Sequence, residues 1–222
     1  MIDDLNHFWE RIHHVLLDMD GTLLDRYFDD YFWEHYLPNI FAKKNGLPEA
    51  EALDHLLSRY KQREGTLDWT DLDFWSTQLD LDIPALKLSI DHLIKVHPFV
   101  IAFLNFCRRT GKRVFLVTNA HGKTLDIKMK KTALTGYFDR IVCSQEVGMA
   151  KENPLFWEKL GGIIPYDPDH ALLADDTEAV LASAQLFGIR ELIYVARPSS
   201  RKSPEPSLNF RSIHYFSELI PE

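Results

Sequence analysis

The chain has 222 residues, of which 45% are apolar and 26% charged, and this composition is typical of a soluble globular protein with one substantial core and a small second module. Its formal net charge of −8 argues against a nucleic-acid polymer as a partner, because such a polyanion would be repelled. Two cysteines, Cys107 and Cys143, are too few for a disulfide scaffold, and their apolar surroundings favour buried free thiols. The polar N-terminus and the lack of a long apolar run argue against secretion and membrane insertion, so we expect a cytoplasmic location.

Five short, mostly apolar runs predict β-strands. Their nearly continuous hydrophobicity is typical of strands buried on both faces, as in a parallel sheet. Helix-like segments alternate with the later runs, and this alternation predicts an α/β fold with right-handed crossovers. In chain order, the expected elements are the strand His14–Leu17, the helix Phe99–Arg109, the strand Arg113–Val117, the helix Lys123–Thr132, the strand Arg140–Cys143, the helix Pro154–Leu160, the strand Ala171–Ala174, the helix Thr177–Phe187 and the strand Leu192–Val195.

The stretch from about residue 29 to residue 96 interrupts this alternation, because it contains no clear strand. Its pattern is typical of several amphipathic helices, with breaks expected near Pro38, residues 46–48, Gly65 and Pro84. A segment of this length is too long for a plain loop. We therefore expect a small helical domain, residues 26–96, inserted after the first strand of an α/β core that comprises residues 1–25 and 97–222.

Two carboxylates follow directly after the first predicted strand, in the run DMDGT. Asp18 and Asp20 are two residues apart at a strand end, where they can meet one oxygen-liganded cation and one phosphate. Asp18 could attack phosphorus while Asp20 handles protons, and Gly21 would let the backbone turn away tightly. Taken alone, this motif is more commonly an acidic turn after a strand.

Three further polar clusters follow other predicted strands. Thr118 and Asn119 could hold phosphoryl oxygens or simply cap the next helix. Lys151 could neutralise a phosphate, although a lone lysine is usually solvated. Asp175 and Asp176 repel each other at a buried strand end unless a cation such as a divalent metal binds there, and one of them could instead cap a helix. Because ligands bind at the carboxyl ends of the strands in an open parallel sheet, all four clusters together predict one site.

The segments LLDMDGTLLD, LVTNA, GMAKENP and LLADDTEAV together resemble the signatures of the haloacid dehalogenase superfamily, and the resemblance covers nearly the whole chain. It implies a Rossmann-like core, a helical cap of the C1 type at the position of the insert, and phosphohydrolase activity. The acids at positions 20, 175 and 176 argue against the metal-free carbon–halogen dehalogenases of the same superfamily. One departure is Val180, where many members carry a further aspartate near the metal.

The resemblance implies a division of labour among these residues. Asp18 would be the nucleophile that forms an aspartyl-phosphate, and Asp20 would protonate the leaving oxygen and then activate water. Mg²⁺ would be held by Asp18, by the backbone carbonyl of Asp20 and by Asp176, with Asp175 assisting. The phosphoryl group would be bound by Thr118, Asn119 and Lys151.

A narrower resemblance, to the bacterial GMP/IMP 5′-nucleotidases of this superfamily, is carried by LLDMDGTLLDRYFDDYFWEHYLP, LDWTDLDFWSTQLDLDI, TNAH and ADDTEAVLASAQLFGIR. It implies that the small phosphomonoester is a purine nucleoside monophosphate, and we expect a monomer or weak dimer. Most aromatic residues of the insert should form its own core, with some available to stack on a base. The candidates for substrate contact, each of which could equally have a structural role, are Asp29, Asp30, His35, Trp69, Asp71 and His121.

Other functions fit the same motifs. Within enzymes, the alternatives are a sugar-phosphate or broad-specificity metabolite phosphatase and a phosphoglucomutase. Outside enzymes, the alternative is a silent phosphometabolite-binding module. Such a module often lacks one of the four clusters, and because none is missing here, an enzyme is favoured.

Overall fold

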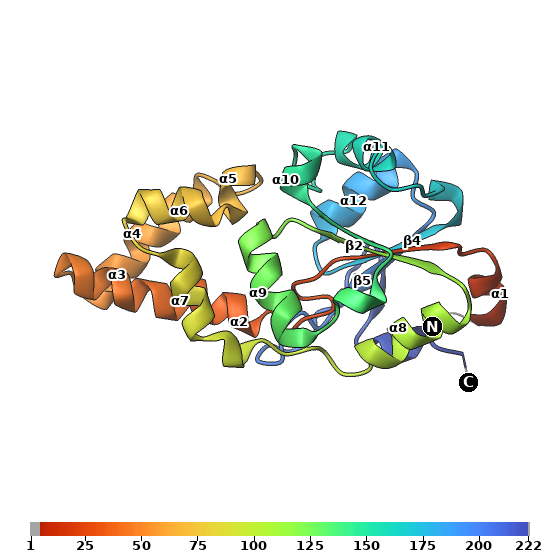
Figure 1. Cartoon of the computed structure of the whole chain (residues 1–222), viewed down its shortest axis with the longest axis horizontal. Helices are drawn as coiled ribbons and strands as arrows, with labels where there is room; N and C mark the ends of the chain where they lie inside the picture. Colours follow the sequence, from red (N-terminus) through yellow and green to blue (C-terminus); the bar gives the residue numbers. More distant parts are fainter. Residues whose placement is uncertain (1–4, 222) are drawn as a thin grey trace.

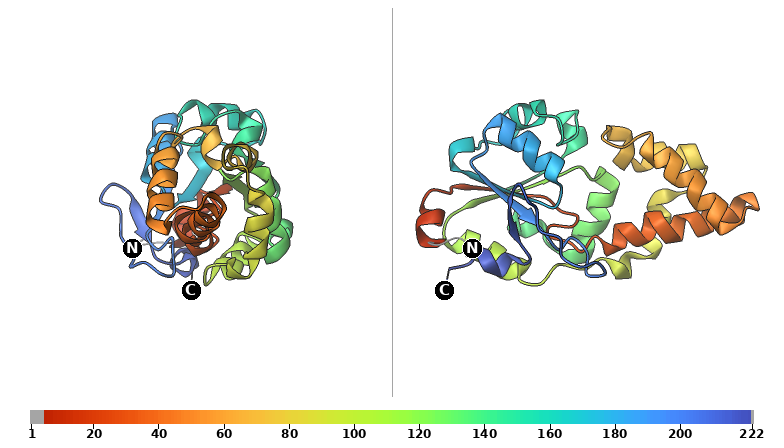
Figure 2. Two further views of the ribbon diagram at one scale, coloured as in Figure 1. Left: turned by 90° about the vertical axis from the view of Figure 1, so that its left-hand side faces the viewer. Right: turned by 180° about the vertical axis from the view of Figure 1, so that it is seen from behind.

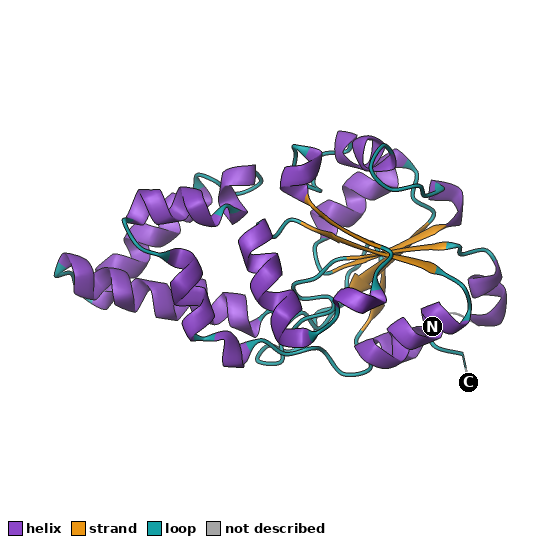
Figure 3. Ribbon diagram, in the orientation of Figure 1, coloured by secondary structure: helices purple, strands orange, loops and turns teal. Residues whose placement is uncertain are grey.

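The computed structural model describes residues 5–221. Its centre is a β-sheet with helices around it (Figures 1 and 3). The sheet has six strands in the order β3-β2-β1-β4-β5-β6, and every neighbouring pair is parallel. This arrangement confirms the predicted α/β fold, and the expected strands all occur within about one residue of their predicted bounds. The strands are β1 (His14–Leu17), β2 (Arg113–Thr118), β3 (Arg140–Cys143), β4 (Ala171–Asp175), β5 (Glu191–Val195) and β6 (Arg211–Ile213).

The strand β6 corrects the expectation of five strands. It has three residues, and it pairs in parallel with β5 at one edge of the sheet. Arg211 is exposed and only Ile213 is buried, so the segment lacks the apolar run by which the other strands were predicted. Its pairing with β5 therefore depends on the tertiary fold rather than on a local pattern.

Helices cover both faces of the sheet (Figures 1 and 2). On one face, Trp9 and Phe103 belong to a large buried cluster that continues into the inserted segment. On the other face, Trp157 and Leu181 belong to a second buried cluster. The core helices are α1 (Leu5–Glu10), α8 (Val100–Arg109), α9 (Gly122–Thr132), α10 (Ser144–Val147), α11 (Leu155–Gly161) and α12 (Glu178–Phe187), with 3₁₀ turns at Thr135–Tyr137, Pro168–His170 and Phe216–Leu219.

The segment between β1 and α8 is a helical cap that lies beyond one end of the sheet, on the left of Figure 1. Its helices pack around buried aromatic rings, as expected, with Tyr60 and Trp75 edge to face at 5.1 Å between ring centroids. The cap comprises α2 (Tyr27–Tyr31), a π-helical turn (Phe32–Tyr36), α3 (Leu37–Asn45), α4 (Glu49–Lys61), α5 (Leu67–Thr70), α6 (Leu72–Leu79), α7 (Ile83–Ser89) and a 3₁₀ turn (Asp91–Leu93).

The break expected near Pro38 takes a different form. The chain stays helical from α2 through α3, and the π-helical turn Phe32–Tyr36 ends two residues before Pro38, which lies in the first turn of α3. A proline inside a helix lacks an N–H and crowds the carbonyl four residues earlier, here that of Glu34. The wider π turn accommodates this defect, so the helix is distorted rather than ended.

Two linkers join the cap to the core and run side by side. Leu24 and Val96 form an isolated antiparallel bridge. The backbone N–H of Asp25 donates to the carbonyl of Lys95 at 2.9 Å, and that of His97 donates to the carbonyl of Leu23 at 2.9 Å. The proposed domain limits at 25/26 and 96/97 fall at this crossing, and they stay a prediction.

Both cysteines are free thiols. Cys107 is buried as expected, and its burial raises the pKa of the thiol to about 12. Cys143 is only half-buried, contrary to expectation, because it ends the edge strand β3, which has a neighbouring strand on one side alone. Across residues 5–221, no helix combines the length and the apolar character needed to cross a membrane.

Candidate active site

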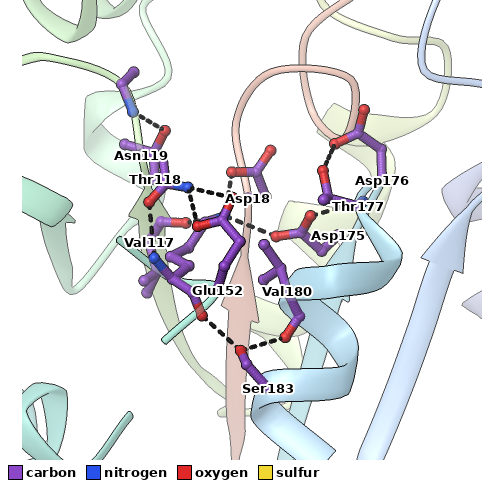
Figure 4. Close-up of polar contacts among 12 residues, drawn as sticks. Asp18, Val117, Thr118, Asn119, Glu152, Asp175, Asp176, Thr177, Val180 and Ser183 are labelled. Atoms are coloured by element: carbon purple, nitrogen blue, oxygen red, sulfur yellow. Dashed lines mark hydrogen bonds and ion pairs between the residues drawn. The ribbon is translucent and has the colours of Figure 1, made fainter. Parts of the chain in front are cut away.

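The polar clusters predicted from sequence meet at the carboxyl ends of three adjoining strands (Figure 4). Asp18 follows β1 directly, Thr118 ends β2 and Asp175 ends β4. Because β1 pairs with both β2 and β4, Asp18 lies between the other two. Parallel strands in register therefore bring Asp18 together with residues that lie 100 and 157 positions further along the chain.

Lys151 lies at the centre of this cluster. Its ammonium Nζ is 2.5 Å from Oδ1 of Asp18 and 2.7 Å from Oδ2 of Asp175, and its side chain is 2% exposed. The Asp175 and Asp18 carboxylates hold the pKa of Lys151 above its ordinary value, although burial acts in the opposite direction. The lysine is therefore a fixed positive charge inside the site, and not the solvated surface residue that is usual for a lone lysine.

Hydrogen bonds hold the loop that carries Lys151 in a fixed position against the core. The Lys151 backbone N–H donates to Oδ1 of Asn119 at 3.0 Å, and the Ser183 hydroxyl donates to the Lys151 carbonyl at 2.6 Å. The Asn119 amide also donates to Glu152 at 2.9 Å. The side chain of Asn119 thus positions the lysine loop, and only its backbone is left for a phosphoryl group.

Three buried carboxylates surround one point of this site. Asp18, Asp175 and Asp176 each present an oxygen atom within 4.8 Å of the others. Burial raises the pKa of Asp18 to about 6, although Lys151 opposes this shift. Burial and the neighbouring Asp175 raise the pKa of Asp176 well above 3.8. This concentration of negative charge is stabilised by a divalent cation with oxygen ligands, so the donor set fits Mg²⁺.

Gly21 is required by the close approach of Asp176. It has φ +87°, and a Cβ built at this position would lie 2.2 Å from Oδ2 of Asp176 and 3.0 Å from Cβ of Pro198. Any side chain here would force the Asp176 carboxylate away from Asp18 and Asp175. The glycine in DMDGT therefore serves both the turn and the carboxylate cluster.

Two basic side chains near the site were not identified from sequence. Arg26 donates from its guanidinium to Oδ2 of Asp176 at 2.8 Å. Lys128, on α9, lies 2.5 Å from Oδ1 of Asp20. Arg26 follows the DMDGTLLD segment and Lys128 lies in the run KMKK, and neither position has a local signal that distinguishes it from a solvated basic residue.

A cavity of about 670 Å³ extends from the carboxylate cluster to the cap. Trp69 lines it with 37% of its surface exposed, whereas Trp75 lines it while almost fully buried in the cap core. Most of the cap's aromatic side chains lie in its buried cluster or pack against it, as expected, whereas Trp69 is partly exposed where it lines the cavity. Other lining residues are Asp18, Asp20, Thr118, Lys151, Asp175, Asp176, Val180, Arg26, Trp33, Leu57, Tyr60, Lys61 and Glu64.

The candidates for substrate contact divide into two groups. Asp29, Asp30 and His121 line the cavity, as Trp69 does. His35 lines another hollow, of about 540 Å³, which lies between α4 and the segment formed by the π-helical turn and the start of α3, away from the carboxylate cluster. Asp71 caps α6 by accepting hydrogen bonds from the backbone N–H groups of Asp73 and Phe74, so its role is structural.

Comparison with known proteins places this geometry in a family. Residues 12–188 match the haloacid dehalogenase-like hydrolases. The chain is 35% identical to "GMP/IMP nucleotidase YrfG" of Escherichia coli K12 over 98% of both proteins, and 22% identical to "Phosphorylated carbohydrates phosphatase" of Thermotoga maritima over 80% of this chain and 82% of that protein. A crystal structure of a HAD phosphatase from Thermococcus onnurineus superposes with a TM-score of 0.78 at 26% identity, covering 94% of this chain and 96% of that one. The chain therefore belongs to the haloacid dehalogenase-like hydrolases and is a phosphatase of this family.

Proposed function

We propose that the protein is a Mg²⁺-dependent 5′-nucleotidase that hydrolyses purine nucleoside monophosphates, GMP or IMP, through an aspartyl-phosphate on Asp18. The observation that carries the chemistry is the cluster in which Lys151 bridges Asp18 and Asp175, with Asp176 beside them. Nucleophile, fixed cation and metal-binding carboxylates then surround one phosphoryl position, as in-line phosphoryl transfer requires.

The reaction consists of two displacements on phosphorus. In the first, a carboxylate oxygen of Asp18 attacks phosphorus, the bond from phosphorus to the ester oxygen breaks, and the carboxyl group of Asp20 gives its proton to that oxygen. In the second, Asp20 takes a proton from water, the hydroxide attacks phosphorus, and phosphate leaves with Asp18 regenerated. Burial raises the pKa of Asp20 to about 6, against the opposing effect of Lys128, so both of its protonation states are accessible near neutral pH.

The phosphoryl group is held by residues from three strand ends. Lys151 neutralises its charge. Thr118, a buried residue at the end of β2, offers a hydroxyl that accepts a hydrogen bond from the Ala120 backbone N–H at 3.0 Å and can donate to a phosphoryl oxygen. Asp18, Asp175, Asp176 and the backbone carbonyl of Asp20 would hold Mg²⁺, which supplies charge neutralisation for the phosphoryl oxygens.

The substrate assignment depends on the cap end of the cavity. A volume of about 670 Å³ is ample for a nucleoside monophosphate. Trp69 offers a partly exposed indole on which a purine can stack, and Leu57, 44% exposed, adds a further apolar surface. The name of the E. coli relative, a GMP/IMP nucleotidase at 35% identity over 98% of both chains, supports a purine in this position.

A phosphate-release assay with Mg²⁺ tests this proposal. We expect kcat/KM for GMP and IMP to exceed that for glucose 6-phosphate and β-glucose 1-phosphate at least about 10-fold, because the hexose phosphates have no aromatic base to stack on Trp69. Chelation of Mg²⁺ should stop turnover, and added Mg²⁺ should restore it. Acid-quenched enzyme should carry one phosphoryl group on the peptide that contains Asp18.

The other outcomes identify the alternative functions. Equal kcat/KM values for nucleotides and hexose phosphates would rule out a nucleotidase and indicate a broad-specificity phosphatase. Isomerisation of β-glucose 1-phosphate without release of phosphate would identify a mutase. Absence of turnover on every ester, with retained binding, would identify a silent module.

A further inference from the structure

Two buried lysines and two carboxylates form a continuous ion-pair cluster where the cap meets the core. Lys128, on the core helix α9, lies 2.5 Å from Oδ1 of Asp20 and 2.5 Å from Oδ2 of Asp29 on the cap helix α2. Lys87, on the cap helix α7, lies 2.7 Å from Oδ1 of Asp29. Each lysine is 1% exposed. Buried ammonium groups persist only when they are paired, so these four side chains constrain each other.

The cap end of this cluster is rigidly held. The Lys87 ammonium lies 4.7 Å from the ring centroid of Phe32 and 4.9 Å from that of Phe28, both of which are buried in the cap. Asp29 therefore has a fixed position relative to the cap core. Since Oδ2 of Asp29 binds Lys128, the position of the lysine depends on where the cap is seated.

The core end of the cluster determines which oxygen of Asp20 is available for chemistry. Lys128 binds Oδ1, and within residues 5–221 no hydrogen bond to Oδ2 is found. The Asp20 side chain is 24% exposed and lines the cavity. With Oδ1 held by the ammonium, Oδ2 is the oxygen that faces the substrate and can carry the proton.

We propose that Lys128 is the positioning residue for Asp20, and that Asp29 makes this positioning depend on the seated cap. The inference rests on the proposed role of Asp20 as proton donor to the leaving oxygen. Lys128 acts through Asp20 and touches no reacting atom. Its loss leaves the nucleophile Asp18 and the bridging Lys151 in place, because neither contacts Lys128.

The test uses Lys128→Met and compares two leaving groups. The 5′-oxygen of GMP needs a proton to leave, whereas 2,4-dinitrophenolate leaves as a stable anion. We expect kcat/KM to fall at least about 100-fold for GMP and less than about 10-fold for 2,4-dinitrophenyl phosphate, because only the first depends on the positioned acid. Lys131→Met is the matched control, because Lys131 lies on the same helix and the substitution removes only an exposed ion pair to Asp91. Its kcat/KM for each of the two substrates should stay within about 2-fold of wild type.

Asp20→Asn separates failure of this inference from failure of the proposed mechanism. If Asp20→Asn lowers kcat/KM equally for GMP and for 2,4-dinitrophenyl phosphate, Asp20 is not the acid of the first step and the mechanism itself is wrong. The readout is kcat/KM because kcat also includes the second step, in which Asp20 acts as the base for both substrates. If Asp20→Asn is selective for GMP but Lys128→Met slows both substrates equally, the mechanism stands and Lys128 has only a structural role. Should Lys128→Met fail to fold, Lys128→Gln keeps an amide group that can donate hydrogen bonds but has no charge, and a preference for loss on GMP of at least about 10-fold is expected of it too.

Asp29→Asn tests the connection to the cap. We expect kcat/KM for GMP to fall about 10-fold with the same leaving-group selectivity, because Lys128 loses the partner that holds it to the cap. The double variant Asp29→Asn/Lys128→Met should be no slower on GMP than Lys128→Met alone within about 2-fold, since both changes act through Asp20. Multiplicative losses in the double variant would show that Asp29 acts independently and would overturn the cap connection.

Discussion

The sheet edge and the cap line the same cavity, but they hold their side chains in different ways. At the sheet edge, Asp18, Thr118 and Asp175 take their positions from the backbone, because each lies at the end of a strand whose register is set by its neighbours. In the cap, Tyr60 and Trp75 take theirs from edge-to-face packing of rings on separate helices. Hydrogen-bonded strands tolerate little displacement, whereas packed helices can be repacked.

Two buried lysines that contact acidic residues of the site, Lys151 and Lys128, show the same difference. Lys151 is held within the core alone, by Asp18, Asp175 and the pinned loop around it. Lys128 is shared between core and cap, through Asp20 and Asp29. We therefore expect substitutions at the sheet edge to lower the rate with every substrate. Substitutions in the cap should instead change the selectivity among substrates or the position of the acid Asp20.

The strongest test of the sheet edge is Asp18→Asn. We expect kcat to fall at least about 10⁴-fold on all phosphate esters, because the amide cannot act as the nucleophile. The fold should persist, as measured by circular dichroism, since the amide is nearly isosteric and Lys151 keeps Asp175. Asp126→Asn, at an exposed position on α9, is the control and should change nothing. Undiminished phosphate release by Asp18→Asn would remove Asp18 as nucleophile.

Gly21→Ala tests how closely the sheet edge is packed. The new methyl group displaces the Asp176 carboxylate, so we expect the Mg²⁺ concentration for half-maximal activity to rise at least about 10-fold. Gly111→Ala is a matched control, because Gly111 also has a positive φ of +69° but has nothing within 4 Å of a built Cβ. The positive φ should lower the free energy of unfolding of both variants by about 1–2 kcal/mol, and Gly21→Ala should lose more because its methyl group also meets Asp176. Equal Mg²⁺ dependence in the two variants would contradict the role of Gly21.

Trp69→Ala tests the cap. We expect KM for GMP to rise about 10-fold, because base stacking on an aromatic side chain contributes about 1–3 kcal/mol, while kcat/KM for 2,4-dinitrophenyl phosphate should stay nearly unchanged. Leu88→Ala is the control, since Leu88 is 56% exposed on α7 and does not line the cavity. Parallel losses on both substrates would show that Trp69 supports the site as a whole.

The smallest expected effect is on stability, where the two regions respond to pH in opposite directions. Burial raises the pKa of Asp18 from 3.8 to about 6, so ionisation of this group opposes folding above that pH. In metal-free protein, its contribution to stability therefore increases as the pH falls from 6 to about 4. At Asp29, burial is outweighed by Lys128 and Lys87, which lower the pKa to about 2, so its contribution is complete above about pH 4 and is lost towards pH 2.

Urea unfolding at a series of pH values measures both contributions. When the pH is lowered from 6 to 4, the free energy of unfolding should increase less for Asp18→Asn than for wild type. Asp29→Asn should be less stable than wild type at pH 5, and this difference should shrink below pH 4. A difference between wild type and Asp29→Asn that does not change with pH would show that the ion pairs contribute nothing through ionisation.

Several features of the site follow from local sequence alone. The run His14–Leu17 occurs as β1 with the predicted bounds, and Asp18 follows it at the sheet edge. Buried parallel strands carry a recognisable apolar run, and their ends share one edge, so the first residues after each run converge whatever the rest of the chain does. The convergence of Asp18, Asp175 and Asp176 could therefore be predicted from these runs. Lys151 lies eight residues beyond the end of β3, so its place in the site was predicted from the four motifs taken together and not from its own position.

Other features depended on contacts that no local pattern carries. Lys128 is one lysine in the run KMKK, and only the tertiary structure determines that it is buried between Asp20 and Asp29, 108 and 99 positions away. The strand β6, the exposure of Trp69 and the separation of His35 from the cavity are of the same kind. Apolar periodicity specifies which residues enter a strand or helix, but the burial and partners of a charged side chain are decided by how the elements pack.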